Sequence, residues 1–385
     1  MQTVYDYAIV GGGCSGLSLA VELVRALSGD RRIAVFEPRR SYHLDRVWCF
    51  WKTTKHRFSH AVGHEWNQWK VRFNGREVMQ ASSQFPYQYL AGDAFYAAAL
   101  ETIKRSASVD LFLQTAVTDI VESKSDVLIS TNRGAFRAKV VFDGRNDVNQ
   151  LLDLGCLLQH YTGQRIRSYR PVFDDRTVTL MDFDVSQRHG ITFVYVLPFS
   201  ENEALVEPTV LSHLPLESSA YAKLIRDYLS GRFNLNNYEV LHEEQGIIPM
   251  TAELSPPKVP TRLIPIGTAA GMVKGSTGYG FLPIQKWSQT IAQDIAAGRH
   301  QRLPKPRSWL STCMDRIFLS FLAEHPSEAP EVFFHLFERV PSERLVRFLS
   351  DRASIIDIVR VIAAMPKRSF IRQAGRVTFA GGTES

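Results

Sequence analysis

The chain has 385 residues, of which 45% are hydrophobic and 22% are charged, a composition that is typical of a globular protein and excludes wholesale disorder. No run of about 18 apolar residues occurs, so the sequence predicts no membrane-spanning helix. The N-terminus also lacks the basic and apolar regions of a signal peptide. We therefore expect a cytoplasmic protein whose four scattered cysteines are free thiols.

The net charge of +6 is distributed unevenly. Residues 299–376 contain fourteen Lys and Arg against eight Asp and Glu, whereas the rest of the chain is balanced. No nucleic-acid-binding motif accompanies this surplus, so we expect no nucleic-acid partner. A basic helical segment is typical either of a solvated helix face or of a membrane-surface patch, and charge alone does not separate the two.

The N-terminal elements predict a βαβ unit. A buried strand over residues 5–10 runs into a glycine-rich turn, a helix with apolar residues at helical spacing follows, and a second strand covers 32–36. Residues 45–86 are rich in Trp, Phe and His and are predicted to be irregular. Further along, we expect helices over 93–106 (with Asp93 as N-cap), 220–230, 284–297 and 309–370, strands within 110–143 and 164–212, and a short buried strand over 263–267.

The glycine-rich turn carries the spacing of a dinucleotide fingerprint. Gly11 permits a tight turn, Gly13 lets a pyrophosphate approach the backbone, and Gly16 allows close packing of the helix on the strand. The free N–H groups at the start of the helix would face the phosphates. Glu37, at the end of the second strand, is placed to accept hydrogen bonds from the adenosine ribose and disfavours a 2′-phosphate. The pattern favours FAD or NAD over NADP.

A second glycine-rich turn decides between FAD and NAD. Gly267-Thr268-Ala269-Ala270-Gly271 follows a buried strand about 250 residues after the first turn. Flavoproteins of the hydroxylase/reductase superfamily have such a late turn at the flavin end of the cofactor, and Asp143-Gly144-Arg145 resembles their middle cofactor motif. The predicted fold is α/β, with a Rossmann-type FAD-binding domain, an interrupting β-sheet substrate domain and a helical C-terminal region.

Longer motifs resemble the flavin-dependent bacterial lycopene cyclase family, nearly from end to end. The segments that carry the resemblance are Asp45-Arg46-Val47-Trp48-Cys49-Phe50, Val141-Phe142-Asp143-Gly144-Arg145, Phe193–Ser200 with Ala204-Leu205-Val206-Glu207, Gly246–Met250, Ile266–Gly271, Lys274–Phe281, Arg347-Phe348-Leu349 and Met365-Pro366-Lys367. The resemblance implies a discontinuous FAD-binding domain (1–55, 87–160 and 258–300), a substrate domain (56–86 and 161–257) and a helical region (301–385).

In that family an acyclic end group of lycopene is protonated, a neighbouring double bond attacks the cation, and a ring proton is lost, so no net electrons move. The resemblance implies a substrate that is lycopene or a related linear polyene, reduced FAD as cofactor, and NAD(P)H as the electron source. No metal is implied. The cofactor-binding residues that it implies are Gly11, Gly13, Cys14, Ser15, Gly16, Glu37, Arg46, Trp48, Asp143, Gly267, Thr268, Ala269, Gly271, Thr277 and Gly278.

Glu207 is the candidate catalytic acid. Protonating an alkene needs a carboxylic acid that stays protonated near neutral pH, and burial among apolar groups provides one. Glu207 lies in an apolar run and matches the acid of the family's short acidic motif, although the strand alone would favour a solvent-facing glutamate. Pro208 departs from the family pattern and predicts a strand edge or a bulge. We expect its missing donor to favour a protonated Glu207. Gly275 and Asn146 also depart from the pattern.

Aromatic residues beside these motifs would stabilise a carbocation, although most are expected to be core: Phe193, Tyr195, Phe199, Tyr279, Phe281, Trp48 and Phe50. His56, His60 and His64 recur at helical spacing but have no further ligands, so we expect no metal site. Lys274 is interpreted as a flavin or phosphate contact or as a solvated loop lysine.

Because carotenoids reside in membranes, we expect a peripheral contact with the inner face of the membrane. The candidates are the basic C-terminal helices with Arg344, Arg347, Lys367 and Arg368, and the apolar residues Phe318, Phe321, Leu322, Phe333, Phe334 and Phe337; a helical lid on the substrate domain is the alternative. Two other functions stay open. One is an FAD-dependent monooxygenase or reductase acting on a polyene or another apolar substrate, and the other is a non-catalytic flavin- or carotenoid-binding protein.

Overall fold

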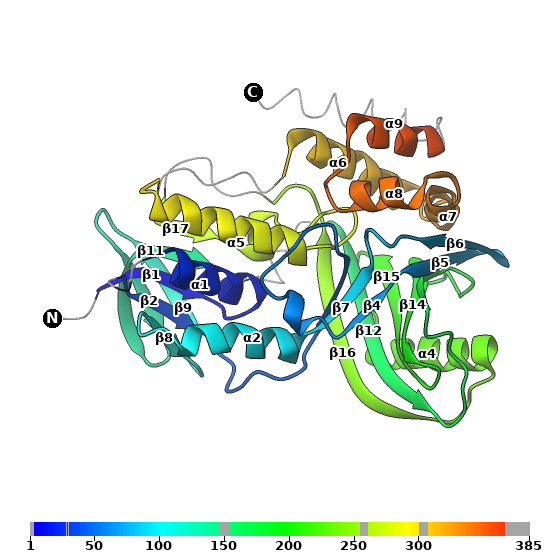
Figure 1. Ribbon diagram of the computed structural model, residues 1–385, viewed down its shortest axis with the longest axis horizontal. Coiled ribbons are helices and arrows are strands. Elements are labelled where there is room, and N and C mark those ends of the chain that lie inside the picture. The colour runs from blue at the N-terminus through cyan, green and yellow to red at the C-terminus, as the bar shows by residue number, and fades with distance from the viewer. Residues whose placement is uncertain are drawn as a thin grey trace.

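The computed structural model describes residues 4–27, 29, 31–145, 155–254, 261–299 and 307–365 (Figure 1). They form three sheets and two groups of helices. The first sheet has the order β8-β2-β1-β11-β10-β9, with β17 paired to β11. Its strands are β1 (Val4–Val10), β2 (Ile33–Phe36), β8 (Val109–Phe112), β9 (Val117–Glu122), β10 (Val127–Thr131), β11 (Gly134–Asp143) and β17 (Leu263–Pro265).

The first sheet is built on parallel pairings of β1, which lies between β2 and β11. Helices α1 (Cys14–Ala26), α2 (Gly92–Lys104) and α5 (Phe281–Ala296) pack together in one layer beside it (Figure 1). Strands buried on both faces consist of continuous apolar runs, as Tyr7 to Val10 do. The late strand β17 therefore returns the chain to the sheet in which it began, and the predicted fold class is confirmed.

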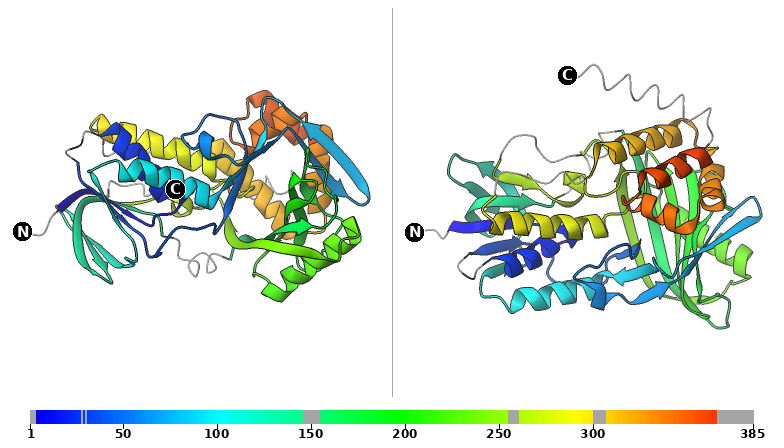
Figure 2. Two further views of the ribbon diagram at one scale, coloured as in Figure 1. Left: turned by 60° about the horizontal axis from the view of Figure 1, so that its bottom comes forward. Right: turned by 45° about the horizontal axis from the view of Figure 1, so that its top comes forward.

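The second sheet has the order β16-β12-β15-β14-β13-β5-β6. Its strands are β5 (Gln68–Phe73), β6 (Arg76–Ala81), β12 (Leu157–Ser168), β13 (Thr177–Asp182), β14 (Ile191–Ser200), β15 (Glu203–Ser212) and β16 (Tyr238–Met250). Side chains alternate between its two faces. One face packs on α4 (Ser218–Phe233), and the other faces the C-terminal helices (Figure 2).

Residues 45–86 were expected to be irregular, and that prediction is wrong. They contain β5 and β6, and also β3 (Val47–Trp51), β4 (His64–Trp66) and the short helix η1 (Ser59–Ala61). Strands β3 and β4 pair with β7 (Tyr87–Ala91) in a third, three-stranded sheet. Another correction concerns α2, which begins at Gly92 with Ala91 as its N-cap, so that Asp93 lies inside the first turn.

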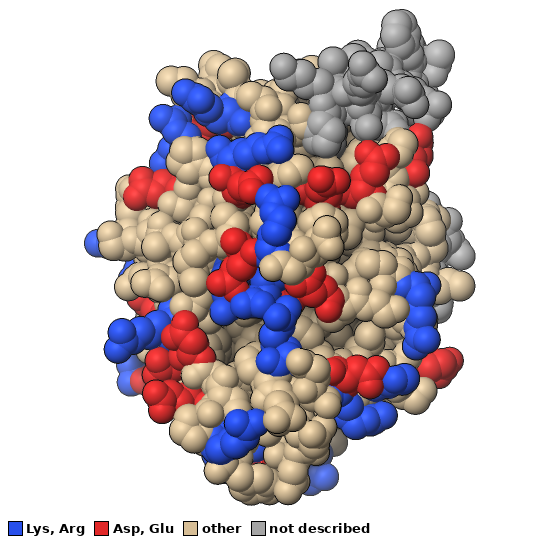
Figure 3. All heavy atoms as spheres, turned by 90° about the vertical axis from the view of Figure 1, so that its right-hand side faces the viewer, with Lys and Arg blue, Asp and Glu red and all other residues tan. Residues whose placement is uncertain are grey.

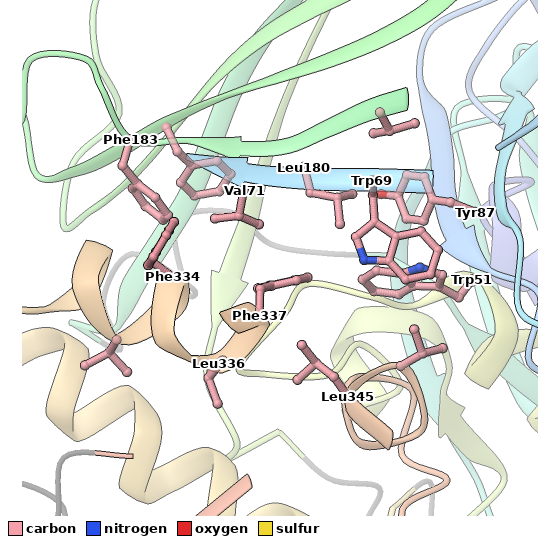
Figure 4. Packing of buried hydrophobic residues seen from close by; sticks show 14 of the residues in the cluster. Trp51, Trp69, Val71, Tyr87, Leu180, Phe183, Phe334, Leu336, Phe337 and Leu345 are labelled. Carbon is pink, nitrogen blue, oxygen red and sulfur yellow. The ribbon is translucent and has the colours of Figure 1, made fainter. Parts of the chain in front are cut away.

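Four helices form a cap over the second sheet: α6 (Trp309–Glu324), α7 (Ala329–Arg339), α8 (Ser342–Leu349) and α9 (Ile355–Ala364). Figure 4 shows Phe334, Phe337 and Leu345 of this cap facing Trp51, Trp69 and Phe183 across an apolar core. Among the described residues, no helix combines the length and the hydropathy needed to cross a membrane.

The face formed by α7 and the β5–β6 hairpin carries cations and anions interspersed rather than separated (Figure 3). The ion pair between Arg76 on β6 and Glu338 on α7 belongs to this pattern. A carboxylate of the cap is therefore paired with a cation of the hairpin on this face.

Candidate active site

The first glycine turn joins β1 to α1. Gly11 has a φ of +94°, and a Cβ on Gly16 would lie 1.9 Å from the carbonyl oxygen of Gly11, so only glycine fits at position 16. A Cβ on Gly13 would meet no protein atom within 4 Å. Gly13 is also the N-cap of α1, and no side chain caps the N–H groups of this helix. The turn thus offers an open side and free donors to an anion.

The second glycine turn lies against the first. It forms the short helix η2 (Gly267–Ala270), with Gly267 and Gly271 at positive φ, and a Cβ on Gly267 would lie 2.7 Å from the Ser15 hydroxyl oxygen. Both turns open into one cavity of about 690 Å³. The predicted site residues that line this cavity are Gly13, Cys14, Ser15, Arg46, Trp48, Gly267, Thr268, Thr277, Gly278 and Glu207.

Other predicted cofactor residues lie behind this lining. Gly11, Gly16, Ala269 and Gly271 support the turns, and Asp143 forms an ion pair with Arg145 at 2.7 Å. Glu37 is buried and accepts hydrogen bonds from the Gly12 N–H at 2.8 Å and the Arg39 guanidinium at 2.9 Å. Burial raises the pKa of Glu37, but the hydrogen bonds from Arg39 and Gly12 hold the pKa below its usual value. A ribose at Glu37 would therefore have to displace or join these donors.

Glu207 points into the same cavity from β15. The side chain is 9% exposed, and its carboxyl accepts a hydrogen bond from the Thr209 hydroxyl at 3.4 Å. Burial, followed by the nearby charge of Glu244 on β16, raises the pKa of Glu207 well above its ordinary value. Burial in this setting favours the protonated form of the carboxyl.

Pro208 does not lie at a sheet edge, so the expectation of an edge or a bulge is wrong. Strand β15 is interior, between β12 and β14, and its register with β12 is the same on both sides of Pro208. The paired residues stop at Tyr161–Thr209 and resume at Gln164–Val206. The missing N–H of Pro208 thus leaves a two-residue gap in the ladder beside Glu207. Asn146, another departure from the family pattern, lies outside the described residues.

A second cavity of about 540 Å³ lies between the second sheet and the cap. Its lining is almost entirely apolar and includes Phe193, Phe318, Phe333, Phe337 and Phe348. The two cavities adjoin, because Trp51, Gln159, Tyr195, Thr277, Tyr279 and Leu349 line both.

The aromatic residues expected around a cation are divided among three places. Tyr195 and Tyr279 lie at the junction of the cavities, Trp48, Phe50 and Phe281 line the larger one, and Phe193 lines the apolar one. Phe199 lines neither and packs on Tyr89. Sequence reasoning missed Trp51, Tyr161 and Glu244. Trp51 directly follows the segment Asp45–Phe50, and Glu244 lies two residues before the segment Gly246–Met250. Neither segment indicated on which face of the strand the side chain would lie.

Lys274 lines the larger cavity, so a flavin or phosphate contact stays a prediction, but the alternative of a solvated lysine is wrong. Its side chain is 3% exposed, and its ammonium pairs with Asp315 and Asp351, each at 2.8 Å. Arg307 also pairs with both aspartates. This ion cluster ties the loop after η2 to α6 and to the loop that follows α8.

The three histidines do not converge. The His56 ring packs edge-on against Phe50 and Phe281, and burial lowers its pKa to about 4. His64 packs on Trp66. Within the described ranges, no group of three or more His, Cys, Asp or Glu is placed to hold a metal.

The cap residues expected to contact a membrane have other contacts. Phe321, Leu322, Phe334 and Phe337 are core residues, and Phe318 and Phe333 line the apolar cavity. Arg344 and Arg347 pair with the buried Asp357 at 3.0 and 2.8 Å. Lys367 and Arg368 lie outside the described residues.

Comparison with known proteins agrees with this architecture. A family model described as lycopene cyclase protein matches residues 6–374. The chain belongs to the lycopene cyclase family. It is 26% identical to a lycopene beta-cyclase from Pantoea ananas, over 95% of this chain and 96% of that protein, and 24% identical to one from Pseudescherichia vulneris, over 94% of each. The resemblance drawn from the motifs is confirmed, and the chain is an enzyme of the lycopene cyclase type.

Solved structures share the fold at low identity. A geranylgeranyl bacteriochlorophyll reductase-like protein from Thermoplasma acidophilum superposes with a TM-score of 0.63 at 13% identity, covering 98% of this chain and all of that one. A p-nitrophenol 4-monooxygenase from Pseudomonas putida superposes with a TM-score of 0.57 at 13% identity, covering all of both chains. This chain thus shares its fold with a reductase-like protein and a monooxygenase.

Proposed function

We propose that this member of the lycopene cyclase family cyclises an acyclic end group of lycopene, or of a related linear polyene, to a β-ionone-type ring by acid–base chemistry. The observation that carries the proposal is the position of Glu207. It is a buried carboxyl with a raised pKa, in a glycine-lined cavity that adjoins an apolar one. An apolar chain can lie in the second cavity while its end group reaches Glu207.

FAD fits the larger cavity, because the uncapped start of α1, the open side of Gly13 and the second glycine turn all face it. When bound in its reduced form, FAD would supply electron density that stabilises a cation in the site. Gly13, Cys14, Ser15, Gly267 and Thr268 would hold it, with Arg46, Trp48, Thr277 and Gly278 nearby. NAD(P)H is the proposed source of the electrons that keep it reduced.

The side chains of this protein account for the proton transfers. Glu207 gives its proton to the terminal double bond, which leaves a tertiary carbocation on the substrate. The rings of Tyr195, Tyr279 and Trp51 face the cavity junction, where their negative faces stabilise positive charge and exclude water. The neighbouring double bond attacks, a carbon–carbon bond closes the ring, and the ring proton returns to the carboxylate. The product therefore has the mass of the substrate.

Pigment analysis of lycopene-accumulating cells that express the chain tests this proposal. We expect a new product of unchanged mass that absorbs at shorter wavelength. Glu207→Gln should lower its formation at least ~100-fold, the contribution expected of a general acid, while FAD binding is retained. Added oxygen would instead indicate a monooxygenase, and added hydrogen a reductase. Untouched lycopene in cells that contain soluble, FAD-loaded protein would contradict the proposal.

We also propose that the outer face of α9 contacts the lipid bilayer. Ile355, Ile356, Val359 and Ile362 are 79%, 63%, 58% and 58% exposed. Val359 and Ile362 line the apolar cavity as well, so this face continues into the cavity. Arg352 and Arg360 are exposed near it. An apolar stripe flanked by cations suits the interface of an anionic bilayer, from which a polyene could enter.

Co-sedimentation with vesicles of phosphatidylglycerol and phosphatidylcholine tests this contact. Replacing the four α9 residues by Ser should abolish binding, whereas the matched control, Met79→Ser with Leu214→Ser at other exposed apolar positions, should leave it unchanged. Equal binding of both variants would reject α9 as the contact.

A further inference from the structure

A second carboxyl lies beside Glu207, across a glycine. Strand β12 runs between β15 and β16, and Gly163 on β12 pairs with Glu244 on β16. On its other side, Gly163 lies in the ladder gap left by Pro208. A Cβ on Gly163 would lie 3.1 Å from the Glu207 Oε2 and 3.3 Å from the Glu244 Cγ. The missing side chain therefore makes the space in which the two glutamates meet.

Glu244 is buried more deeply than Glu207, at 4% exposure. Its two carboxyl oxygens are inaccessible and have no well-aligned hydrogen bond to any described residue, and the Val47 backbone N–H is a nearby donor that acts to lower its pKa. Its neighbour Glu243 is exposed on the opposite face of the strand, where it accepts a hydrogen bond from Gln164 at 2.7 Å. Burying a carboxyl without donors is costly unless it keeps or shares a proton.

We propose that Glu207 and Glu244 share one proton across Gly163, and that Glu244 is a positioning residue that keeps this proton on Glu207. The proposal rests on the proposed function for its role in cyclisation, but the shared proton itself does not depend on the substrate.

Charge in the site supports this division of roles. Two adjacent carboxylates cannot both ionise readily, so ionisation of one raises the pKa of the other. Burial raises the pKa of Glu244 to about 7, while the positive charge of Arg46 acts to lower it. Burial and the charge of Glu244 raise the pKa of Glu207 well above its ordinary value. Because the positive charge of Arg46 acts on Glu244, Glu244 is the member that ionises first and Glu207 keeps the proton.

Other titratable groups face the pair from each neighbouring element. They are Asp45 and Arg46 before β3, Cys49 on β3, Tyr89 on β7, Tyr161 on β12 and Tyr195 on β14. Burial raises the pKa of Cys49 and of the three tyrosines, so they stay neutral where the pair titrates. Arg46 is then the cation in this set that biases the pair.

The arrangement also serves the second half of the reaction. Once Glu207 has given its proton to the alkene, the pair carries two negative charges opposite the substrate cation. Mutual repulsion makes such a pair a strong base, which takes the ring proton and returns to its starting state. One proton leaves and one returns, so the pair is unchanged after each turnover.

Infrared titration of the FAD-loaded full chain tests the proposal without lycopene, because a protonated carboxyl has its own carbonyl band. In the wild type, a band that Glu207→Gln removes should persist above neutral pH. In Glu244→Gln, we expect the midpoint of that band to fall by about one pH unit or more. Glu243→Gln, the matched control, should leave the midpoint unchanged. An unchanged midpoint in Glu244→Gln would overturn the proposal.

The pH profile of cyclisation gives a second readout. In Glu244→Gln, the alkaline limb of the pH profile should shift to lower pH by the same amount as the infrared midpoint. At a fixed pH on that limb, activity should then fall about tenfold for each pH unit of the shift. Glu244→Asp should restore part of it. Gly163→Ala, which places a methyl group between the carboxyls, should lower the midpoint as well, and it tests the pair if Glu244→Gln fails to fold.

These outcomes separate the two proposals. If the protein leaves lycopene untouched but Glu244→Gln lowers the infrared midpoint, the shared proton is supported and the proposed function is contradicted. If the protein cyclises lycopene but substitutions at residues 244 and 163 leave the Glu207 band unchanged, the proposed function is supported and the shared proton is contradicted.

Discussion

Glycine serves different purposes at two positions of the first turn, and alanine should separate them. At Gly16 a Cβ would overlap the Gly11 carbonyl, so Gly16→Ala should destabilise the fold by about 3 kcal/mol or more and lose FAD. At Gly13 a Cβ meets no protein atom, so Gly13→Ala should keep the fold and weaken FAD binding alone. Thermal melting and flavin absorbance measure both effects. Equal melting temperatures for the two variants would contradict this interpretation.

His56 should make the protein acid-sensitive. Burial lowers its pKa from the ordinary 6.5 to about 4, so the unfolded chain binds a proton more readily than the folded one between these values. The stability from neutral His56 is complete above pH 6.5 and is lost as the pH falls toward 4. His56→Phe, which suits the contacts with Phe50 and Phe281, should flatten that part of the curve of melting temperature against pH. An unchanged slope would show that other groups control it.

At the scale of elements, the cap depends on one buried ion cluster. Lys274→Met would leave Asp315 short of a cation in a buried site, at a cost of about 3 kcal/mol, because Arg307 would then be the one described cation that pairs with it. The double variant Lys274→Met with Asp315→Leu should recover much of that loss. Chemical denaturation measures the stability, and hydrogen exchange in α6 reports whether the cap loosens. A double variant less stable than the single one would contradict this expectation.

The sequence suggested that Arg344 and Arg347 contact the membrane, but in the structure they belong to a second ion cluster. We therefore expect their replacement to change stability first. Arg344 and Arg347 hold the buried Asp357 at the start of α9. The hydrogen bonds from Arg347, with those of Ser354, hold the pKa of Asp357 below its ordinary value. Arg347→Met should therefore loosen α9 and lower the melting temperature, and its effect on vesicle binding should follow only from that loosening.

Local patterns were predictable and long-range pairings were not. The glycine turns, β1, α1 and α5 follow from neighbours in sequence, and the structure has them. Strands β3 and β5 were missed because their partners lie in distant segments, as with β5 and β13. Strand β6 pairs with its neighbour β5 and was missed with it. Glu207 was predicted from the resemblance of its segment to the family's acidic motif, but Glu244 gains its role only through β12, which separates the two strands. The ion pairs of Lys274 and Arg347 likewise depend on how the cap docks.

At the scale of the whole molecule, the junction of the two cavities includes Leu349. Leu349→Trp should narrow this junction and lower turnover of a long polyene at least ~10-fold, with FAD binding unchanged. Leu214→Trp, at a position 72% exposed, is the control. Flavin absorbance and product chromatography measure the two properties. Full turnover in Leu349→Trp would mean that the substrate reaches Glu207 by another route.

The cap also imposes an order on synthesis. Trp51 and Trp69, made early, bury their rings against Phe334, Phe337 and Leu345, which leave the ribosome some 265 residues or more after Trp69 (Figure 4). From the completion of β16 at Met250 until the cap is made, the second sheet of a nascent chain has this apolar face uncovered. Such surfaces attract chaperones and one another. Expression yield should thus be limited less by the stability of the finished protein than by the time for which this face of the sheet stays exposed before the cap is synthesised.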